Sequence, residues 1–198
     1  TVWRYDPRSD AWNELESMPE RRMSAAAVTI GDTVYMAGGV GDSDSLLEFT
    51  LDTGEWRILS GGLHPRDHAN AVAFDRKIWL IGGRGPDGET TAVEIFDPAA
   101  EAWSAGPPLN IARAGFAAAV ADGQIMVAGG EVIISGRETL SSLEVFDPGD
   151  NAWRLGPDLP APIHGVGGAS LGGRFFLLGG SREAGGIANS GTVQIYLP

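Results

Sequence analysis

The 198-residue sequence contains no cysteine, which excludes disulfide bonds, catalytic thiolates and thiolate-bound metals. A chain without cysteine is compatible with reducing and oxidising surroundings alike, so the sequence leaves the localisation unknown. No apolar run approaches the roughly 20 residues that a membrane-spanning helix needs, and we expect no membrane segment. The opening residues 1–5 show neither the charged leader nor the apolar core of a signal peptide.

The sequence also lacks any apolar stripe with the period of an α-helix, so we expect almost no helix. Basic residues are fewer than acidic ones, and the net charge is −12. An acidic chain repels the phosphate backbone of nucleic acids and the surface of anionic membranes. We therefore expect no nucleic-acid partner and no membrane partner.

Motifs typical of cofactor sites and catalysis are incomplete. Residues 83–88 match G-x-G-x-x-G, but a loop and a strand are expected to follow, whereas a dinucleotide site needs a helix. Residues 168–172 match G-x-S-x-G, but Ser170 falls at an expected hairpin tip without an acid–base partner. His64 and His68 flank a proline and cannot form a zinc pair on one helix face. We expect no catalytic residue, no cofactor and no metal.

The sequence does contain a repeated glycine doublet, each copy ending a short apolar run. The doublets are Gly38-Gly39, Gly82-Gly83, Gly129-Gly130 and Gly179-Gly180. A tryptophan precedes the first glycine of each doublet by 26 residues, at Trp12, Trp56, Trp103 and Trp153. An internal period of roughly 45–50 residues indicates an array of similar supersecondary units.

Each unit reads as a four-stranded antiparallel meander. In one unit, apolar runs at 69–74 and 78–81 flank a polar break, which is typical of a β-hairpin. The corresponding breaks in the other units contain glycine, which tolerates the positive φ of tight turns. A third run at 93–96 ends in an Asp-Pro turn, and Trp103 opens a fourth run. The unit therefore supplies four strands in sequence.

Meanders in series are typical of propeller blades, in which neighbouring sheets bury each other's faces. The first strand of each unit carries small residues, which suit the crowded centre of a propeller. The glycine doublets let the backbone approach closely where blades meet. The tryptophans are expected to supply large buried areas between sheets. The predicted fold class is all-β.

An aromatic residue stands seven residues before each tryptophan, in the pairs Tyr5/Trp12, Phe49/Trp56, Phe96/Trp103 and Phe146/Trp153. Arginine stands 16 residues before three doublets, at Arg22, Arg66 and Arg113, whereas Ile163 takes the fourth position. With the doublets, this pattern resembles the kelch family over nearly the whole chain. The resemblance implies a single kelch β-propeller domain over residues 1–198, with about four repeats of four-stranded antiparallel blades. The repeat units cover approximately 16–59, 60–106, 107–156 and 157–198, the last joined by 1–15.

The strand count leaves two arrangements open. The chain begins and ends with a third strand, at residues 2–5 and 193–196, which gives 17 expected strands. A closed four-bladed ring is one arrangement, with residues 12–15 completing the last blade. An arc of a larger propeller is the other, and it is favoured because kelch propellers resemble rings of six or seven blades. Open edge strands would then allow self-association.

Length varies in only one part of the repeat. From the second glycine of a doublet to the next of the repeated aromatic residues, the distances are 10, 13, 16 and 16 residues. Loops tolerate insertion and carry function, whereas scaffolds do not. In a meander, these loops lie at the same end as the segments that join the blades, near 16–22, 60–66, 106–113 and 156–163. We expect this end to form one binding face.

The resemblance to kelch domains also suggests which side chains line that face. It points to the residues just after each doublet, which are Val40, Arg84, Glu131 and Ser181. It also points to those 14 residues before each doublet, which are Ser24, His68, Gly115 and Gly165. The candidate ligand-binding residues are Arg84, Glu131, His68, Ser181 and Ser24. The repeated arginines are instead expected to form structural hydrogen bonds with loop carbonyls.

Three functions remain open at this stage. The first is a non-enzymatic scaffold that binds a protein or peptide, or a glycan, through the loops after the doublets and between the blades. The second is a sugar mutarotase or epimerase like those acting on sialic acid, with Glu131 and His68 as acid–base groups. The third is a purely structural repeat of a larger surface protein. The first is favoured, so the protein is not expected to be an enzyme.

Overall fold

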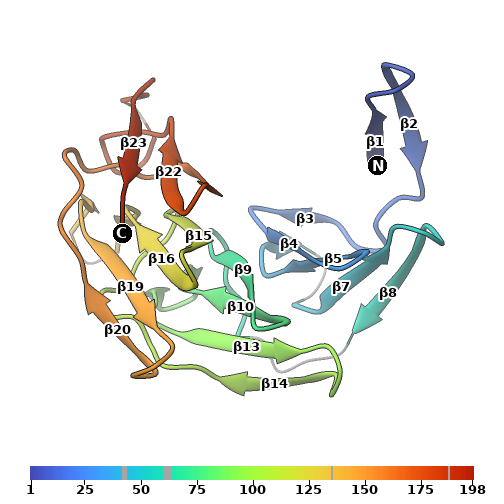
Figure 1. The fold of residues 1–198 in the computed structure, drawn as a ribbon, viewed down its shortest axis with the longest axis horizontal. Helices are drawn as coiled ribbons and strands as arrows, with labels where there is room; N and C mark the ends of the chain where they lie inside the picture. Colours follow the sequence, from blue (N-terminus) through green and yellow to red (C-terminus); the bar gives the residue numbers. More distant parts are fainter. Residues whose placement is uncertain (42–43, 60–63, 135, 187) are drawn as a thin grey trace.

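The computed structural model describes residues 1–41, 44–59, 64–134, 136–186 and 188–198, which form strands and no helix (Figure 1). This confirms the all-β prediction. None of the described residues belongs to a helix that is long and apolar enough to cross a membrane. The chain opens with a hairpin of β1 (Val2–Asp6) and β2 (Ala11–Leu15).

Four antiparallel sheets follow the hairpin, and we call them blades 1 to 4. Blade 1 contains β4 (Ala26–Ile30), β5 (Thr33–Ala37), β7 (Leu46–Thr50) and β8 (Glu55–Leu59). Blade 2 contains β9 (Asn70–Phe74), β10 (Lys77–Ile81), β13 (Val93–Asp97) and β14 (Ala102–Ala105). Blade 3 contains β15 (Ala117–Ala121), β16 (Gln124–Ala128), β19 (Leu143–Asp147) and β20 (Ala152–Leu155). Blade 4 contains β21 (Gly167–Leu171), β22 (Arg174–Leu178) and β23 (Val193–Tyr196).

Every blade is a meander in which neighbouring strands along the chain pair with each other. The constant spacing of aromatic and tryptophan residues reflects the register of strands three and four. Phe96 lies opposite Trp103 and Phe146 opposite Trp153, and their ring centroids are 5.1 and 5.4 Å apart. The expectation that all the tryptophans are buried between sheets is wrong, however. Trp153 is only 8% exposed but Trp12 is 65% exposed, because no sheet covers the outer side of the opening hairpin.

Three apolar clusters lie between successive blades. The cluster between blades 3 and 4, for example, packs Met126 and Leu143 of blade 3 against Phe175 and Leu177 of blade 4. The innermost strands β4, β9, β15 and β21 contact one another in that order. Each interior sheet thus buries both faces against its neighbours, which is how a propeller stabilises its blades.

The blades form an arc. Figure 1 shows the β1–β2 hairpin and blade 4 at opposite ends of this arc, with blades 2 and 3 between them. The expected pairing of residues 12–15 with the last blade is not formed, because β2 pairs with β1 and β23 pairs with β22. The described residues therefore form an open arc, and the closed four-bladed ring is not formed. One face of blade 4 stays open, and Leu171 is 74% exposed.

The glycine doublets bring neighbouring blades together, as predicted. Both glycines of every doublet have positive φ. The second glycine of three doublets donates its N–H to a carbonyl of the next blade, for example from Gly83 to Arg113 at 2.8 Å. A Cβ at Gly82 would lie 2.9 Å from the same carbonyl oxygen and 2.8 Å from the Phe116 ring. A side chain at this position would force the two blades apart.

The segments after three doublets form short strands where only loops were expected. After the second and third doublets these are the pairs β11 (Arg84–Gly85) with β12 (Gly88–Glu89) and β17 (Glu131–Val132) with β18 (Glu138–Thr139). After the first doublet, β6 (Val40–Gly41) pairs instead with β3 (Arg22–Met23), which precedes blade 1 in the sequence. These six strands and the 17 expected ones account for the 23 strands of the described residues. The variable segments are therefore ordered by backbone hydrogen bonds at the same end of every blade.

Candidate functional site

One backbone pairing recurs at this end of all four blades. It joins the residue just after each doublet to the residue 15 positions before the doublet, and the partners are antiparallel. The pairs are Met23 with Val40, Asp67 with Arg84, Ala114 with Glu131, and His164 with Ser181. The loops after the doublets thus meet the segments between blades, as the sequence predicted. We call these residues the bridge pairs.

The next residue in each blade belongs to a chain of backbone hydrogen bonds that we call the inner ladder. His68 N–H donates to the Ser24 carbonyl at 3.1 Å, Gly115 to His68 at 2.9 Å and Gly165 to Gly115 at 2.7 Å. All four residues have left-handed φ, between 50° and 62°. The ladder therefore fixes the spacing of neighbouring blades through main-chain atoms, including at the non-glycine positions Ser24 and His68.

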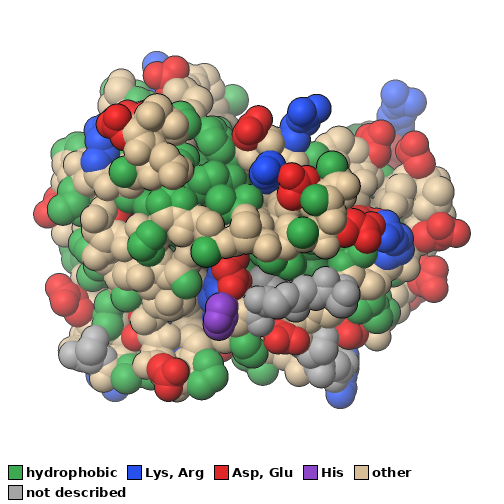
Figure 2. Space-filling model, turned by 90° about the horizontal axis from the view of Figure 1, so that it is seen from below, with side chains coloured by type: hydrophobic (Ala, Val, Ile, Leu, Met, Phe, Trp, Pro, Cys, Tyr) green, Lys and Arg blue, Asp and Glu red, His purple; other side chains and the backbone are tan. Residues whose placement is uncertain are grey.

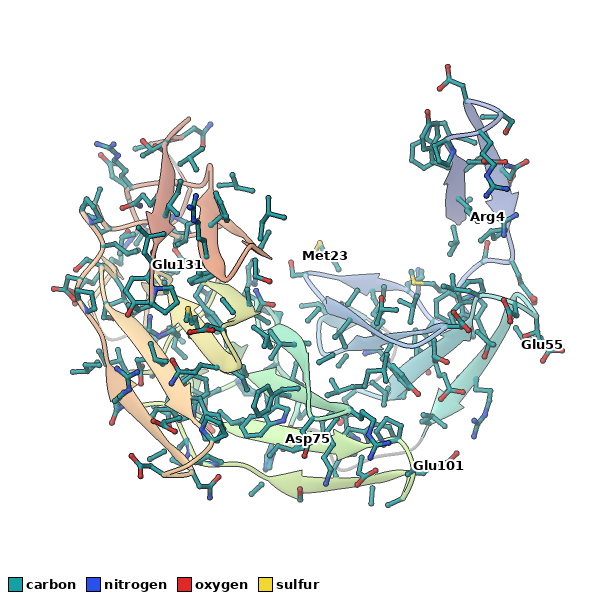
Figure 3. The ribbon with its side chains drawn as sticks, in the orientation of Figure 1. Arg4, Met23, Glu55, Asp75, Glu101 and Glu131 are labelled. Atoms are coloured by element: carbon teal, nitrogen blue, oxygen red, sulfur yellow. The ribbon has the colours of Figure 1, made fainter. Side chains whose placement is uncertain are left out.

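Side chains of the bridge pairs form a polar network across blades 2, 3 and 4. Arg84 donates from Nε to Glu89 Oε1 at 2.7 Å and from Nη2 to Glu131 Oε1 at 2.8 Å. Glu131 Oε2 accepts from the Gly185 N–H at 3.0 Å and lies 3.1 Å from His164 Nδ1. Glu131 is only 4% exposed, so its carboxylate depends on these partners. Figure 3 shows Glu131 on the blade 3 and blade 4 side of the arc, with Met23 across from it on blade 1.

Blade 4 completes the network through backbone atoms of its own long loop. His164 Nε2 lies 2.7 Å from the Glu183 carbonyl, which requires that this nitrogen carry a proton. The Ser181 hydroxyl also donates to the Glu183 carbonyl, at 3.2 Å, and accepts from the Ala188 N–H at 3.2 Å. Glu131, Ser181 and His164 therefore hold the loop after the fourth doublet in place.

The charges within this network stabilise one another. Burial disfavours the charged form of Arg84, but hydrogen bonds with Glu89 and Glu131 outweigh that effect and raise the pKa of Arg84. Burial likewise opposes the ionised form of Glu89, yet the Arg84 guanidinium and backbone N–H groups lower the pKa of Glu89. Both groups are therefore ionised at neutral pH.

The candidates His68 and Ser24 lie away from this network, on the inner ladder. His68 is exposed, and its Nδ1 lies 2.5 Å from Asp67 Oδ1 of its own blade. Glu131 and His68, the acid–base candidates for sugar chemistry, thus have different partners. Sequence reasoning missed His164 and Glu89. The same counting would have found His164, because it occupies one position before the selected Gly165.

Two of the repeated arginines, Arg22 and Arg113, form the expected structural hydrogen bonds with loop carbonyls, whereas Arg66 donates to the Leu80 carbonyl within strand β10. Arg113 is fully buried and donates to the carbonyls of Gly129 at 2.7 Å and Ser142 at 3.1 Å, and to the Ser142 hydroxyl at 2.9 Å. It also pairs with the buried Glu144 at 2.9 Å. Burial lowers the pKa of Arg113, and Glu144 opposes that effect.

Blade 4 replaces this ion pair by a neutral arrangement. Ile163 stands in place of the arginine, and Gln194 stands in place of the glutamate. The Gln194 amide accepts from the Ala161 N–H and donates to the Ala161 carbonyl, both at 3.1 Å. The loss of the cation is thus matched by the loss of the carboxylate, which leaves no buried charge unpaired at these two positions.

Two hollows lie beside the bridge pairs of blades 1 and 2. The first has a volume of 600 Å³ and is lined by Val40, Asp44, Asp67 and Arg84 among others. The second has a volume of 530 Å³ and lies under the loop of blade 2. No group of histidine, aspartate or glutamate side chains suited to a metal ion occurs in the part of the chain that the structure describes. On the side of the molecule shown in Figure 2, acidic and basic side chains are interspersed.

Comparisons with known proteins agree with this architecture. The family model described as the KLHDC2/KLHL20/DRC7 Kelch-repeats domain matches residues 1–180. The chain is 35% identical over 142 residues to the Kelch-like protein terF of Aspergillus terreus (strain NIH 2624 / FGSC A1156), covering 64% of this chain and 31% of that protein. It is 31% identical over 134 residues to the human Kelch repeat and BTB domain-containing protein 13, covering 64% and 29%.

The chain thus spans about a third of the length of these relatives. Among solved structures, the one titled "Structure of YjhT" superimposes with a TM-score of 0.75 at 17% sequence identity. The superposition covers 93% of this chain and 67% of that one. At this identity, the likeness supports the fold alone.

Proposed function

The chain belongs to the kelch-repeat β-propeller family, and from this premise we propose that it is a non-enzymatic module that binds a protein or peptide segment. The contact surface is the end of the blades that carries the bridge pairs. A peptide lying across this end would meet the loops after the doublets and the segments between the blades.

The bridge pairs are the observation that supports this proposal. Their backbone pairing is the same in all four blades, but their side chains differ in chemistry. Blade 1 offers the apolar side chains of Met23 and Val40, which are 65% and 51% exposed. Blade 2 offers Asp67 and Arg84, which are both partly exposed. A constant frame with variable side chains is typical of a binding surface.

The polar network suits positioning better than proton transfer. Glu131 is held by Arg84, His164 and the Gly185 N–H, so its carboxylate has little freedom to exchange a proton with a substrate. In our proposal Arg84 keeps a partly exposed edge for a partner, and Glu131 and Ser181 keep neighbouring loops in shape. His68, exposed on the inner ladder, contributes a further polar contact.

The test begins with a random peptide library displayed on phage and selected on the immobilised chain. The affinity of a selected peptide is then measured by fluorescence anisotropy. Met23→Asp with Val40→Asp places two charges on the proposed surface, and we expect at least a tenfold loss of affinity. Burying such charges against an apolar peptide group costs more than about 1.4 kcal/mol.

Asp75→Asn with Arg76→Gly is the matched control, because asparagine and glycine tolerate the left-handed φ of 48° and 57° at these positions. These residues form the exposed turn between β9 and β10, at the opposite end of blade 2. The control should bind the peptide with the affinity of the unmodified chain. Equal binding by the Met23/Val40 variant, or loss of binding in the turn variant, would place the contact surface elsewhere and refute the proposal.

A further inference from the structure

The loop that follows the fourth doublet is held differently from its counterparts. After the second and third doublets, the chain is ordered by the strand pairs β11 with β12 and β17 with β18. In the described part of blade 4 no such strand pair follows the doublet, and Ser181 makes isolated bridges to His164 and Asn189. The blade 4 loop (residues 181–186 and 188–190) therefore depends more on side-chain contacts for its position.

His164 is the side chain that joins this loop to blade 3. It is only 6% exposed, and both of its ring nitrogens face acceptors. Nε2 lies 2.7 Å from the Glu183 carbonyl oxygen on the loop, and Nδ1 lies 3.1 Å from Glu131 Oε2. A histidine stands at this bridge-pair position in blade 4 alone. The other blades have Met23, Asp67 and Ala114 there.

Neither acceptor can supply the proton that its contact with the ring needs. A carbonyl oxygen has no proton to give, so Nε2 of His164 must carry one. Glu131 accepts from Arg84 at Oε1, 2.8 Å away, and from the Gly185 N–H at Oε2, 3.0 Å away, which are the contacts of a carboxylate. A neutral imidazole carries a single proton, so its Nδ1 would turn a lone pair towards Glu131. The contacts therefore fit the doubly protonated imidazolium.

The other charged groups around the ring are already paired or exposed. Arg84 of blade 2 is held between two carboxylates, one of which is Glu131. Arg137 of blade 3 donates from Nη2 to a carbonyl of the blade 4 loop at 3.4 Å, and Arg182 and Glu183 are exposed on that loop. Glu131 is thus the buried anion that faces the ring. A hollow of 370 Å³ beside the ring gives the loop room to move away.

We propose that His164 and Glu131 form a proton-dependent latch that holds the blade 4 loop on blade 3. With both ring nitrogens protonated, the imidazolium bridges Glu131 and the Glu183 carbonyl. Loss of the Nδ1 proton leaves a buried lone pair against the carboxylate, which is costly, so the loop separates from blade 3. The loop is therefore closed at lower pH and opens as the pH rises. Because the loop lies on the proposed contact surface, the latch would make peptide binding depend on pH, and that consequence alone rests on the proposed function.

NMR on the chain without any peptide tests the latch. Long-range proton–nitrogen spectra show which ring nitrogens of His164 carry protons as the pH is raised. Hydrogen exchange of the Arg182 N–H, which bonds the Ala188 carbonyl at 2.9 Å within the loop, is compared at each pH with that of an unstructured peptide. We expect the protection of Arg182 to fall about tenfold or more over the pH range in which the ring loses its second proton. The Leu140 N–H, which donates to the Gly130 carbonyl in blade 3, should keep its protection.

Two variants remove the proton dependence in different ways. Glu131→Gln replaces the carboxylate by an amide that can donate to the neutral ring, so the loop should stay protected as the pH rises. His164→Gln removes the titrating ring but keeps a donor for the Glu183 carbonyl, so the protection of Arg182 should no longer change with pH. His68→Asn is the matched control, because His68 is exposed and asparagine tolerates its left-handed φ of 50°. In this control the transition should persist.

A His164 ring that carries one proton throughout the pH range of the folded chain would overturn the proposal. Ring and loop transitions at clearly different pH values would overturn it as well. Persistence of the transition in Glu131→Gln, or its loss in His68→Asn, would equally count against the latch. Failure of the phage-selected peptide to depend on Met23 and Val40 would refute the proposed function and leave the latch standing.

Discussion

Replacing Arg113 by isoleucine should destabilise the protein strongly, and a second substitution should reverse much of that effect. Arg113→Ile leaves Glu144, which is fully buried, without its cation. Removing one partner of a buried ion pair costs about 3–5 kcal/mol of unfolding free energy. The carboxylate keeps hydrogen bonds from the backbone N–H groups of Asn110 at 2.7 Å and Ile111 at 3.1 Å, so we expect the lower half of this range.

The double variant Arg113→Ile with Glu144→Gln reproduces blade 4. There Gln194 bonds both backbone groups of Ala161, and Ile111 is the residue equivalent to Ala161. The amide introduced by Glu144→Gln is therefore expected to bond both the N–H and the carbonyl of Ile111. The remaining losses are the donors to the Gly129 and Ser142 carbonyls and to the Ser142 hydroxyl. The Ser142 carbonyl still accepts from the Gly129 N–H, so we expect the Gly129 carbonyl to account for most of the cost, at about 1–3 kcal/mol. The double variant should thus recover on the order of 2 kcal/mol relative to Arg113→Ile.

Urea unfolding followed by tryptophan fluorescence measures these differences, provided that the slope with denaturant is the same for all variants. Glu144→Gln alone completes the thermodynamic cycle, which isolates the coupling between the two sites. A double variant no more stable than Arg113→Ile would refute the argument that charge balance explains Ile163 and Gln194.

Three further predictions concern the blade contacts and the polar network. Gly130→Ala should lower the free energy of unfolding in urea by more than about 2 kcal/mol, because φ is 102° and a Cβ would lie 3.0 Å from the Ala114 carbonyl oxygen. Gly136→Ala is the control: a Cβ there meets nothing within 4 Å, so the unfolding free energy should change by less than about 0.5 kcal/mol. Because the pKa of Glu89 is lowered in the folded protein, its ionised carboxylate stabilises the fold at pH values above the ordinary pKa of a glutamate, and this stabilisation is lost as the pH falls. The melting temperature of Glu89→Gln should therefore decline less steeply than that of the unmodified chain below about pH 4. An equally steep acid decline in that variant would contradict this. The unfolding free energy of His68→Gly in urea should lie within about 1 kcal/mol of that of the unmodified chain. His68→Val should be clearly less stable, because φ is 50° at this position and a β-branched residue is strained there.

The repeat spacing predicted the fold because it records backbone geometry. A seven-residue interval between Phe96 and Trp103 is the span of two paired strand residues and their turn. The 16-residue interval between Arg113 and Gly129 is the span between a guanidinium and the carbonyl that it bonds. A change in the length of such an interval would break a specific contact, so the intervals recur from repeat to repeat within this single sequence.

The site could be predicted only in part, because side-chain partners depend on contacts between blades. The repeat spacing placed Arg84 and Glu131 at equivalent positions, but it did not show that their side chains form a hydrogen bond with each other across the boundary between blades 2 and 3. Glu89 carried no signal of its own, since it joins the network through its hairpin partner Arg84. His164 could have been found from its place in the repeat, but its contact with Glu131 of the neighbouring blade could not.

The inner ladder links its four residues through main-chain N–H and carbonyl groups alone, so the side chains at those positions take no part in holding the blades together. In these residues the main-chain atoms hold neighbouring blades together, and the side chains are left to contact a partner. Ser24 or His68 can be exchanged for another residue that accepts the left-handed conformation, and the separation of the blades stays fixed. The surface near the centre can therefore diversify one blade at a time, as independent sites on a common frame.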